Sequence, residues 1–251
     1  MEILPISLPL KIRKFDIFST LCSSGFKFLQ NDVVIISSKY LSISEGAVMR
    51  IKDVKVGKKA RRLADKYGLM PELTELVIKE SDHIFPGVPG FLLGVKDGTI
   101  APNAGIDKSN IPSGFFVLYP RQPFKSAKVL KQKFFNNLGL NVGIVIADSR
   151  IMPMRIGTVG VAIANAGFEP VEDLRGKKDL FGRTLKVTFK AVADSIATMG
   201  VSVMGEANES TPAAVVRGMK TIPTERNLSW HDLAVDAEKD IYRRGFLERN
   251  S

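Results

Sequence analysis

The sequence has little sulfur and imidazole chemistry, with one cysteine and two histidines among its 251 residues. A single cysteine excludes an internal disulfide framework and is typical of a reducing compartment. Cys22, His83 and His231 cannot complete a tetrahedral zinc site of the usual kind. The sequence also lacks an apolar run of the roughly 18 residues that span a bilayer, and its N-terminus lacks a charged-then-apolar signal pattern. We expect a cytoplasmic protein with no membrane segment.

These rare residues are poor candidates for catalysis. Cys22 lies between Leu21 and Ser23, so we expect a buried, inert thiol rather than a nucleophile. His83 is better explained as a surface or capping residue than as a catalytic base, and the same holds for His231 beside Trp230. No serine, cysteine or histidine triad can be assembled, which disfavours covalent catalysis by a side chain.

Positive charge exceeds negative charge, with 36 Lys and Arg against 26 Asp and Glu and a net charge of +10. Such an excess attracts anionic small molecules or polyanions, although an ordinary basic surface explains it equally well. The cations are spread over residues 52–66, 125–133 and 243–249 without the aromatic interleaving of a single-strand binder. Nucleic acid is therefore a minor hypothesis.

The chain is long and apolar enough for a full core, since 45% of its residues are hydrophobic. It forms either one domain over residues 1–251 or two subdomains without a recognisable boundary. β-branched runs predict buried strands at 32–38 and 142–147, the second carrying Asp148 and Ser149 at its carboxyl end. Amphipathic spacing predicts helices at 58–67, 71–80 and 126–138, with Gly68 and Gly139 ending the first and third.

Other elements are predicted from turn signals and apolar spacing. A turn-rich connector at 85–90 precedes a hairpin around Asp97-Gly98, which leads into the loop 103–110. Apolar residues from Leu185 to Gly200 recur at helical spacing and predict a long helix towards Met204. Ser229 is a suitable N-cap for a closing helix that reaches Leu247.

Two segments point to metal-assisted chemistry on a phosphate. Asn103-Ala-Gly-Ile-Asp107-Lys-Ser-Asn110 and Val142-Gly-Ile-Val-Ile-Ala-Asp148-Ser149 each place a carboxylate beside small polar residues after an apolar run. Oxygen ligands of this kind favour Mg²⁺ or Mn²⁺. From the residues alone, Asp107 could equally be the acceptor of a local turn. Phosphate-binding glycine motifs of the P-loop and dinucleotide types are absent.

These segments resemble the coenzyme F420-0:γ-glutamyl ligase family, and the resemblance covers most of the chain to about Gly218. It implies an α+β fold of mixed layers with two interwoven subdomains. Further matching segments follow in the family's order: Ser42-Ile-Ser-Glu45-Gly46, Arg155-Ile-Gly157, Arg175-Gly-Lys-Lys-Asp179-Leu-Phe-Gly182-Arg183, Ala193-Asp194, Met204-Gly205-Glu206 and Val216-Arg217-Gly218.

The resemblance implies an enzyme that joins L-glutamate to F420-0 through a γ-linkage, using GTP. The γ-phosphoryl group would pass to the F420-0 carboxylate, and the glutamate amine would attack the resulting acyl phosphate. The expected cofactors are Mg²⁺ or Mn²⁺, with K⁺ as a further candidate. The expected partners are F420-0, L-glutamate, GTP and a second copy of the chain in a homodimer.

The resemblance also assigns roles to individual residues. Asp107, Asp148 and Arg155 are expected to be catalytic. Asp107, Asp148, Ser149 and Glu206 are expected to hold the metal. The nucleotide is expected to contact Leu8, Pro9, Leu10, Lys11, Ser38, Lys39, Asn110, Ser149, Met204, Gly205, Glu206, Ala207, Asn208, Glu209, Ser210 and Thr211. By itself, the polar turn 207–211 could line phosphates or merely connect two elements.

Two positions depart from the family pattern and keep alternatives open. Ile43 stands where a lysine that contacts the nucleotide is usual, so Lys39 or Lys11 would have to supply that charge. Residues 150–154 replace the usual Gly-Arg pair near the expected acceptor. A paralogous ligase with another acceptor and a non-catalytic nucleotide or nucleic-acid-binding protein are the alternatives. Arg155, Arg175 and Arg183 could bind an anionic substrate or simply pair with Asp173 and Asp179.

Overall fold

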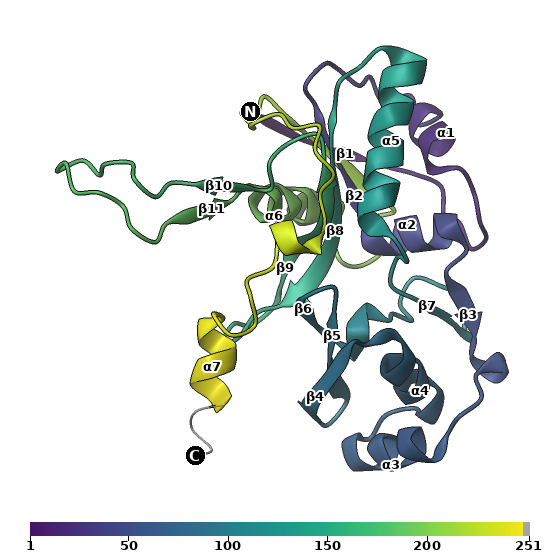
Figure 1. Cartoon of the computed structure of the whole chain (residues 1–251). Coiled ribbons are helices and arrows are strands. Elements are labelled where there is room, and N and C mark those ends of the chain that lie inside the picture. Colours follow the sequence, from purple (N-terminus) through teal and green to yellow (C-terminus); the bar gives the residue numbers. More distant parts are fainter. Residues whose placement is uncertain (248–251) are drawn as a thin grey trace.

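A five-stranded sheet forms the centre of the molecule (Figure 1). We describe a computed structural model over residues 1–247, so Arg249 in the third basic stretch lies outside it. The strand order is β1-β12-β2-β8-β9, in which β2 and β8 are parallel and the other three pairs are antiparallel. The strands are β1 Glu2–Ile6, β2 Val33–Ser37, β8 Gly143–Ile151, β9 Thr158–Ala166 and β12 Ala213–Arg217.

Helices cover both faces of this sheet, because its inner strands are apolar on both faces. In β2, Val34 and Ile36 pack into the core under α1, α2 and α5, whereas Val33 and Ile35 pack into the core under α6. This alternation is the normal period of a strand and confirms the buried strand expected at 32–38. The helices are α1 Ile17–Cys22, α2 Ser38–Glu45, α5 Pro123–Leu138 and α6 Val192–Met204.

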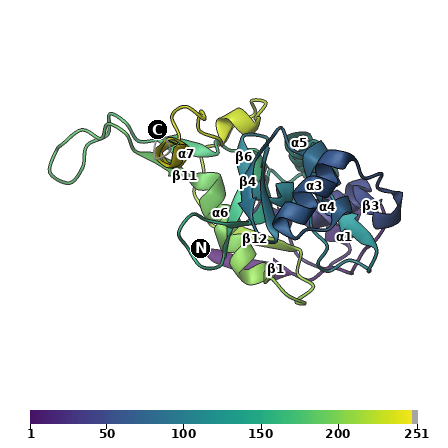
Figure 2. The ribbon, with the colours of Figure 1, turned by 90° about the horizontal axis from the view of Figure 1, so that it is seen from below.

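A second group of elements has its own core around Phe116, Leu92 and Val77. It lies beside the lower end of the central sheet in Figure 1 and away from α6 in Figure 2. The group contains β3 Val48–Arg50, η1 Ile51–Asp53, α3 Lys58–Tyr67, α4 Pro71–Glu80, β4 His83–Val88, β5 Phe91–Lys96, β6 Thr99–Pro102, η2 Asn103–Gly105 and β7 Phe115–Val117. The sheets are β4-β5-β6 and β3-β7.

The remaining elements are a projecting ribbon and the C-terminal segment. Strands β10 Val171–Asp173 and β11 Phe189–Ala191 form a ribbon that projects from the molecule in both views (Figures 1 and 2). The chain ends with η3 Trp230–Asp232 and α7 Ile241–Leu247. The α+β class is confirmed, while the division into subdomains stays a prediction. Within residues 1–247, none of the helices has the length and apolar character needed to cross a membrane.

Several predicted elements are confirmed. Helices α3 and α4 have the expected bounds, and α3 and α5 end at Gly68 and Gly139 in the left-handed conformation. Helix α5 begins three residues earlier than predicted, because Pro123 is well suited to a first helical turn. The hairpin between β5 and β6 turns at Asp97 and Gly98, with φ values of 47° and 70°.

Other predictions are wrong, mostly because backbone pairing extends beyond the local signal. The predicted connector at 85–90 is a turn only at Pro89 and Gly90, since β4 continues to Val88 as an outer strand with an irregular register at its proline and glycine. Strand β8 does not end before Asp148, because β9 pairs with it as far as Ile151. The helix towards Met204 begins only at Val192, because residues 189–191 pair with β10. The closing segment is two short helices rather than one.

Candidate active site

The ends of the parallel strands β2 and β8 bring Ser38 and Asp148 together. Their register pairs Ser37 with Ala147, so the following residues of the two strands are neighbours. The Oγ of Ser38 donates a hydrogen bond to Oδ1 of Asp148 over 2.6 Å. The structure therefore places a carboxylate and a hydroxyl, both predicted from sequence, at one edge of the central sheet.

Arg150 is the second partner of Asp148. Its Nε lies 2.8 Å from Oδ2 of the carboxylate, and its guanidinium lies 5.9 Å from the ring centre of Tyr119. The arginine side chain is only 6% exposed, and its Nη1 and Nη2 have no hydrogen-bond partner among residues 1–247. A buried cation with unsatisfied donors is costly unless an acceptor is supplied. Arg150 is therefore suited to a bound anion.

The loop after η2 carries Asp107 to the same region. Its backbone is fixed by reciprocal hydrogen bonds between Asp107 and Val117. Its carboxylate accepts hydrogen bonds from the backbone and hydroxyl of Ser109 at 2.7 and 2.9 Å, and pairs with Nζ of Lys39 at 2.6 Å. The local turn considered in the sequence analysis is thus present, and Lys39 joins it to α2.

These contacts set the ionisation of Asp107. Burial acts to raise the pKa of Asp107, but the hydrogen bonds from Lys39 and Ser109 outweigh it and hold the pKa below its ordinary value. The carboxylate is consequently charged at neutral pH and balanced by the ammonium group of Lys39. A fixed charge of this kind can orient a cation or a polar substrate.

The loop after α6 reaches the site from the other face of the sheet. Successive strand residues point to opposite faces, so Ser149 points away from Asp148. Its Oγ donates to Oε1 of Glu206 over 2.6 Å, and Thr158 on β9 donates to the same atom over 3.1 Å. Asn110 links the two loops, because its Nδ2 donates to the carbonyl of Ala207 over 2.7 Å.

Internal hydrogen bonds hold the rest of this loop. The backbone amide of Ala207 donates to Glu209, and the hydroxyl of Thr211 donates to the carbonyl of Met204. The amide of Leu8 donates to the carbonyl of Ser210, which brings the N-terminal segment alongside. The residues predicted at 8–11 and 204–211 therefore lie next to one another, although Leu10 and Lys11 make no contact with Asp107 or Asp148 that the structure records.

A cavity of about 200 Å³ lies between these elements. It is large enough for a carboxylate or a phosphoryl group and too small for a whole nucleotide. Its polar lining comes from Ser38, Lys39, Asp107, Asp148, Ser149, Arg150 and Thr158, and its apolar lining includes Ile106, Leu118 and Tyr119.

The carboxylates predicted to bind a metal are engaged by other side chains of the protein. Over residues 1–247, the structure contains no group of three or more His, Cys, Asp or Glu residues arranged to hold a metal. Asp107 pairs with Lys39, Asp148 with Arg150, and Glu206 is bonded to Ser149 and Thr158. The donors are nonetheless all hard oxygens that suit Mg²⁺ or Mn²⁺. The predicted ligands fit such an ion chemically, and the metal site stays a prediction.

Several other candidates lie away from this cavity. Arg175 forms a bidentate pair with Asp173, and Arg183 lies 4.0 Å from Asp179, which is the alternative weighed for them. Arg155 is exposed in the turn between β8 and β9. Ile43 is 3% exposed, so its position belongs to the interior. Cys22 is exposed, and the prediction of a buried thiol is wrong, because α1 ends at this residue and leaves it at the surface.

Sequence reasoning missed Tyr119 and Thr158, and it noted Arg150 only as part of the departure at residues 150–154. These three residues carry no motif of their own, and their importance comes from burial and strand pairing. A further signal for Arg150 was its spacing, because a residue two positions after Asp148 on a strand lies on the same face. That signal was hidden by the prediction that the strand had already ended.

Comparisons with known proteins show the family to which the chain belongs. The family model described as F420-0:Gamma-glutamyl ligase matches residues 12–218. The coenzyme F420:L-glutamate ligase of Archaeoglobus fulgidus is 34% identical over 245 residues, which are 97% of each chain. The proteins of that name from Methanocaldococcus jannaschii and Methanopyrus kandleri are 36% and 35% identical, over 84% and 88% of each chain. The chain therefore belongs to the F420-0:γ-glutamyl ligase family.

Proposed function

We propose that the chain is a ligase that adds L-glutamate to coenzyme F420-0 through a γ-linkage, driven by GTP and a divalent metal. Membership of the family and the similarity to coenzyme F420:L-glutamate ligases support a glutamate ligase of F420 biosynthesis. The single observation that carries the chemistry is the cavity where Asp107, Asp148, Lys39 and Arg150 meet. It offers two cations and two carboxylates in a space that fits one reacting group.

The reaction proceeds in two steps. An oxygen of the F420-0 carboxylate attacks the γ-phosphorus of GTP, and GDP leaves with the electron pair of the broken bond. The neutral glutamate amine then attacks the acyl carbon, the bond between that carbon and the bridging oxygen breaks, and phosphate leaves with the oxygen that came from the carboxylate. The nitrogen gives up one proton to solvent as the amide forms. Activation is needed because a carboxylate has no adequate leaving group of its own.

The side chains have distinct roles in this scheme. Arg150 offers two buried Nη donors to the acceptor carboxylate, and Lys39 balances the γ-phosphate beside Asp107. The loop 204–211, with Asn110 and the segment 8–11, contacts the nucleotide. Divalent metal would neutralise the triphosphate, with Asp107 and Asp148 as ligands from one face of the sheet and Ser149 and Glu206 from the other, and K⁺ is a further candidate. Arg155 is proposed to reach the reacting phosphate. We further propose a cytoplasmic homodimer with one ligase-like domain per chain.

One alternative within the same fold is a paralogous ligase with another acceptor. Arg150 favours this alternative, because it belongs to the segment 150–154 that departs from the family pattern and because it lines the cavity. Incubation of the purified chain with F420-0, L-glutamate, GTP and Mn²⁺ separates the possibilities, with products resolved by mass spectrometry. GTP-dependent glutamylated product is expected. GTP cleavage that requires glutamate but yields no glutamylated F420-0 indicates another acceptor, and absence of GTP binding indicates a non-catalytic protein.

A further inference from the structure

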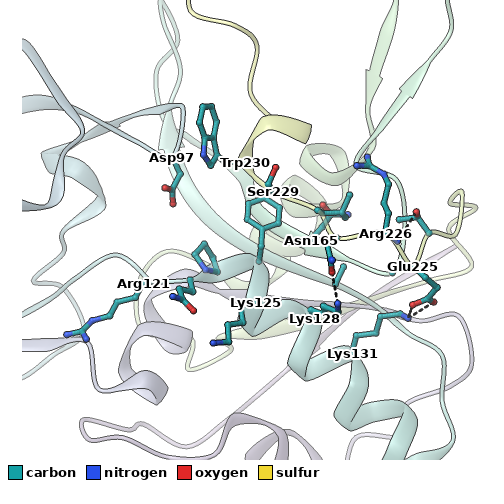
Figure 3. Close-up of a pocket in the computed structure, with 18 residues that line it drawn as sticks. Asp97, Arg121, Lys125, Lys128, Lys131, Asn165, Glu225, Arg226, Ser229 and Trp230 are labelled. Carbon is teal, nitrogen blue, oxygen red and sulfur yellow. Dashed lines mark hydrogen bonds and ion pairs between the residues drawn. The ribbon is translucent and has the colours of Figure 1, made fainter.

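A second cavity of the described chain lies outside the site above. It has a volume of about 530 Å³ and lies between the first half of α5 and the segment 224–230 (Figure 3). The walls combine cations from the helix with the rings of Phe124 and Trp230. We call this cavity the basic pocket, with the polar lining residues Asp97, Arg121, Lys125, Lys128, Lys131, Asn165, Glu225 and Arg226.

Part of the positive charge in the basic pocket is not neutralised by the protein. Lys131 pairs with Glu225 at 2.6 Å, and Arg226 is held by Glu169 and Asp232. In contrast, Arg121 and Lys125 have neither an ion pair nor a hydrogen bond from their side chains within residues 1–247. Lys128 contacts only the neutral amide of Asn227, at 2.5 Å. Asp97 is the one further carboxylate of the lining and has no ion pair among residues 1–247, so three cations against one carboxylate leave the pocket with a net positive charge.

The N-terminus of α5 adds donors to the same wall. This helix has sixteen residues, and its N-cap Gln122 makes no capping hydrogen bond from its side chain. The first amides of such a helix are unsatisfied and attract anions, phosphates above all. A second observation is Asn165, which lines the pocket, is 1% exposed, and has an Oδ1 without a hydrogen-bond partner. A buried acceptor of this kind calls for a donor from a ligand or a water molecule.

The basic pocket adjoins the reaction cavity along one backbone segment. Tyr119 and Pro120 line the small cavity, and Arg121 and Gln122 line the basic pocket. Neighbouring Cα atoms are about 3.8 Å apart, so the two linings meet within a single residue step. A ligand that reached both cavities would have its anionic group in the basic pocket and its carboxylate near Arg150.

We propose that the basic pocket binds the acceptor substrate of this ligase, through a phosphate ester and a flat ring remote from the reacting carboxylate. Lys125, Lys128, Arg121 and the α5 amides bind the phosphate ester, and Trp230 and Phe124 contact the ring. The inference rests on the proposed function for the identity of the ligand. The charge and shape of the pocket do not depend on the proposed function.

Trp230 provides the test, because it is the single tryptophan of the chain and lines this pocket. The fluorescence emission of Trp230 is followed while inorganic pyrophosphate, the bare anion probe, is added. The pH is held fixed, because the ring of His231 lies 3.5 Å from the indole and a change in its charge would alter the emission. A saturable change in emission is expected.

Lys125→Glu and Arg121→Glu are each expected to raise the Kd for pyrophosphate and the Kd for F420-0 about tenfold. The Kd for F420-0 is measured by calorimetry. Lys59→Glu, on exposed α3, is the matched control and should leave both values unchanged.

The outcomes separate this inference from the proposed function. Product formation with an unchanged KM for F420-0 in Lys125→Glu would overturn the pocket assignment and leave the ligase standing. Binding that is lost in Lys125→Glu, without GTP-dependent product in the wild type, would support the pocket and reject the ligase. Equal affinities in Lys125→Glu and Lys59→Glu would overturn the pocket assignment. Tighter binding of a single-stranded oligonucleotide than of either small anion, with a steep salt dependence, would replace it by a nucleic-acid site.

Discussion

Oδ2 of Asp148 lies 2.8 Å from Nε of Arg150, and this ion pair joins a carboxylate that is 21% exposed to a guanidinium that is 6% exposed. Losing one partner is therefore not equivalent to losing the other. If the carboxylate is removed, the more deeply buried charge, that of Arg150, has no counterion. Strand geometry produces the contact, since residues two apart on β8 share a face.

The first prediction concerns this asymmetry. Asp148→Asn should lower the free energy of unfolding by about 3 kcal/mol, because Arg150 then keeps a buried charge without a counterion. Arg150→Met should cost only about 1 kcal/mol, because Asp148 retains solvent and the hydrogen bond from Ser38. Urea unfolding measures both. The double variant should lose less than the sum of the two. A larger loss of unfolding free energy in Arg150→Met than in Asp148→Asn would contradict this account, because it would show that the guanidinium is not the charge left without a counterion.

The second prediction separates catalysis from stability at Asp107. Asp107→Asn should change the free energy of unfolding by less than about 1 kcal/mol, because its side chain is 40% exposed and its ion pair with Lys39 is partly solvated. Its turnover in the GTP-dependent assay should fall by at least about a hundredfold, because it loses a charge beside the reacting phosphate. Asp65→Asn, on the exposed side of α3, is the matched control. Wild-type turnover in Asp107→Asn would remove this residue from the site.

The third prediction is a pH dependence at the start of α1. Asp16 caps this helix through Ser19 and pairs with Lys133, and these contacts lower the pKa of Asp16 from 3.8 to about 2. A lowered folded-state pKa means that the stability contribution is complete above the unfolded value and is lost as pH falls towards 2. Asp16→Asn keeps a capping oxygen but loses the charge. Its deficit against the wild type should be full at pH 7 and reduced to a small fraction at pH 2 in denaturant titrations. A deficit that does not vary with pH would contradict the assigned ion pair.

The fourth prediction concerns the exposed thiol. Burial of part of the sulfur raises the pKa of Cys22, and the neighbouring Asp16 adds to the effect, so the thiol is protonated at neutral pH. Cys22→Ser should leave ligation unchanged. Complete alkylation of the wild type should do the same, because Cys22 lies on α1 and does not line the reaction cavity. Loss of activity after alkylation but not in Cys22→Ser would indicate steric interference, and loss in both would reopen nucleophilic catalysis.

Local patterns predicted much of the fold. Helices α3 and α4 and the turn at Asp97-Gly98 follow from amphipathic spacing, a first-turn proline and residues that tolerate positive φ, all of which act within a few residues. The end of β8 and the start of α6 could not be predicted, because pairing with β9 and β10 decides them. Tertiary contacts override local propensity at such positions.

In the candidate site, too, local motifs identified single residues, whereas tertiary contacts determine how these residues are arranged. Asp107, Asp148 and Ser149 were found through short motifs, but Asp148 and Ser149 lie on opposite faces of β8, and Asp107 reaches the site from the loop after η2. Arg217, part of a family segment, forms two hydrogen bonds of 2.9 Å to Asp32, whose side chain is 0% exposed, and so has a structural role. Arg150 and the basic pocket depend on burial and on segments distant in sequence, which motif reading cannot combine.

The central claim is that a carboxylate is activated by the γ-phosphoryl group of GTP before glutamate attacks it. The most direct measurement starts from F420-0 with ¹⁸O in its carboxylate and follows the isotope in the released phosphate by mass spectrometry. The account predicts one ¹⁸O atom in each phosphate, in step with amide formation and only when glutamate and GTP are both present. Phosphate without ¹⁸O, alongside glutamylated product, would contradict an acyl-phosphate path.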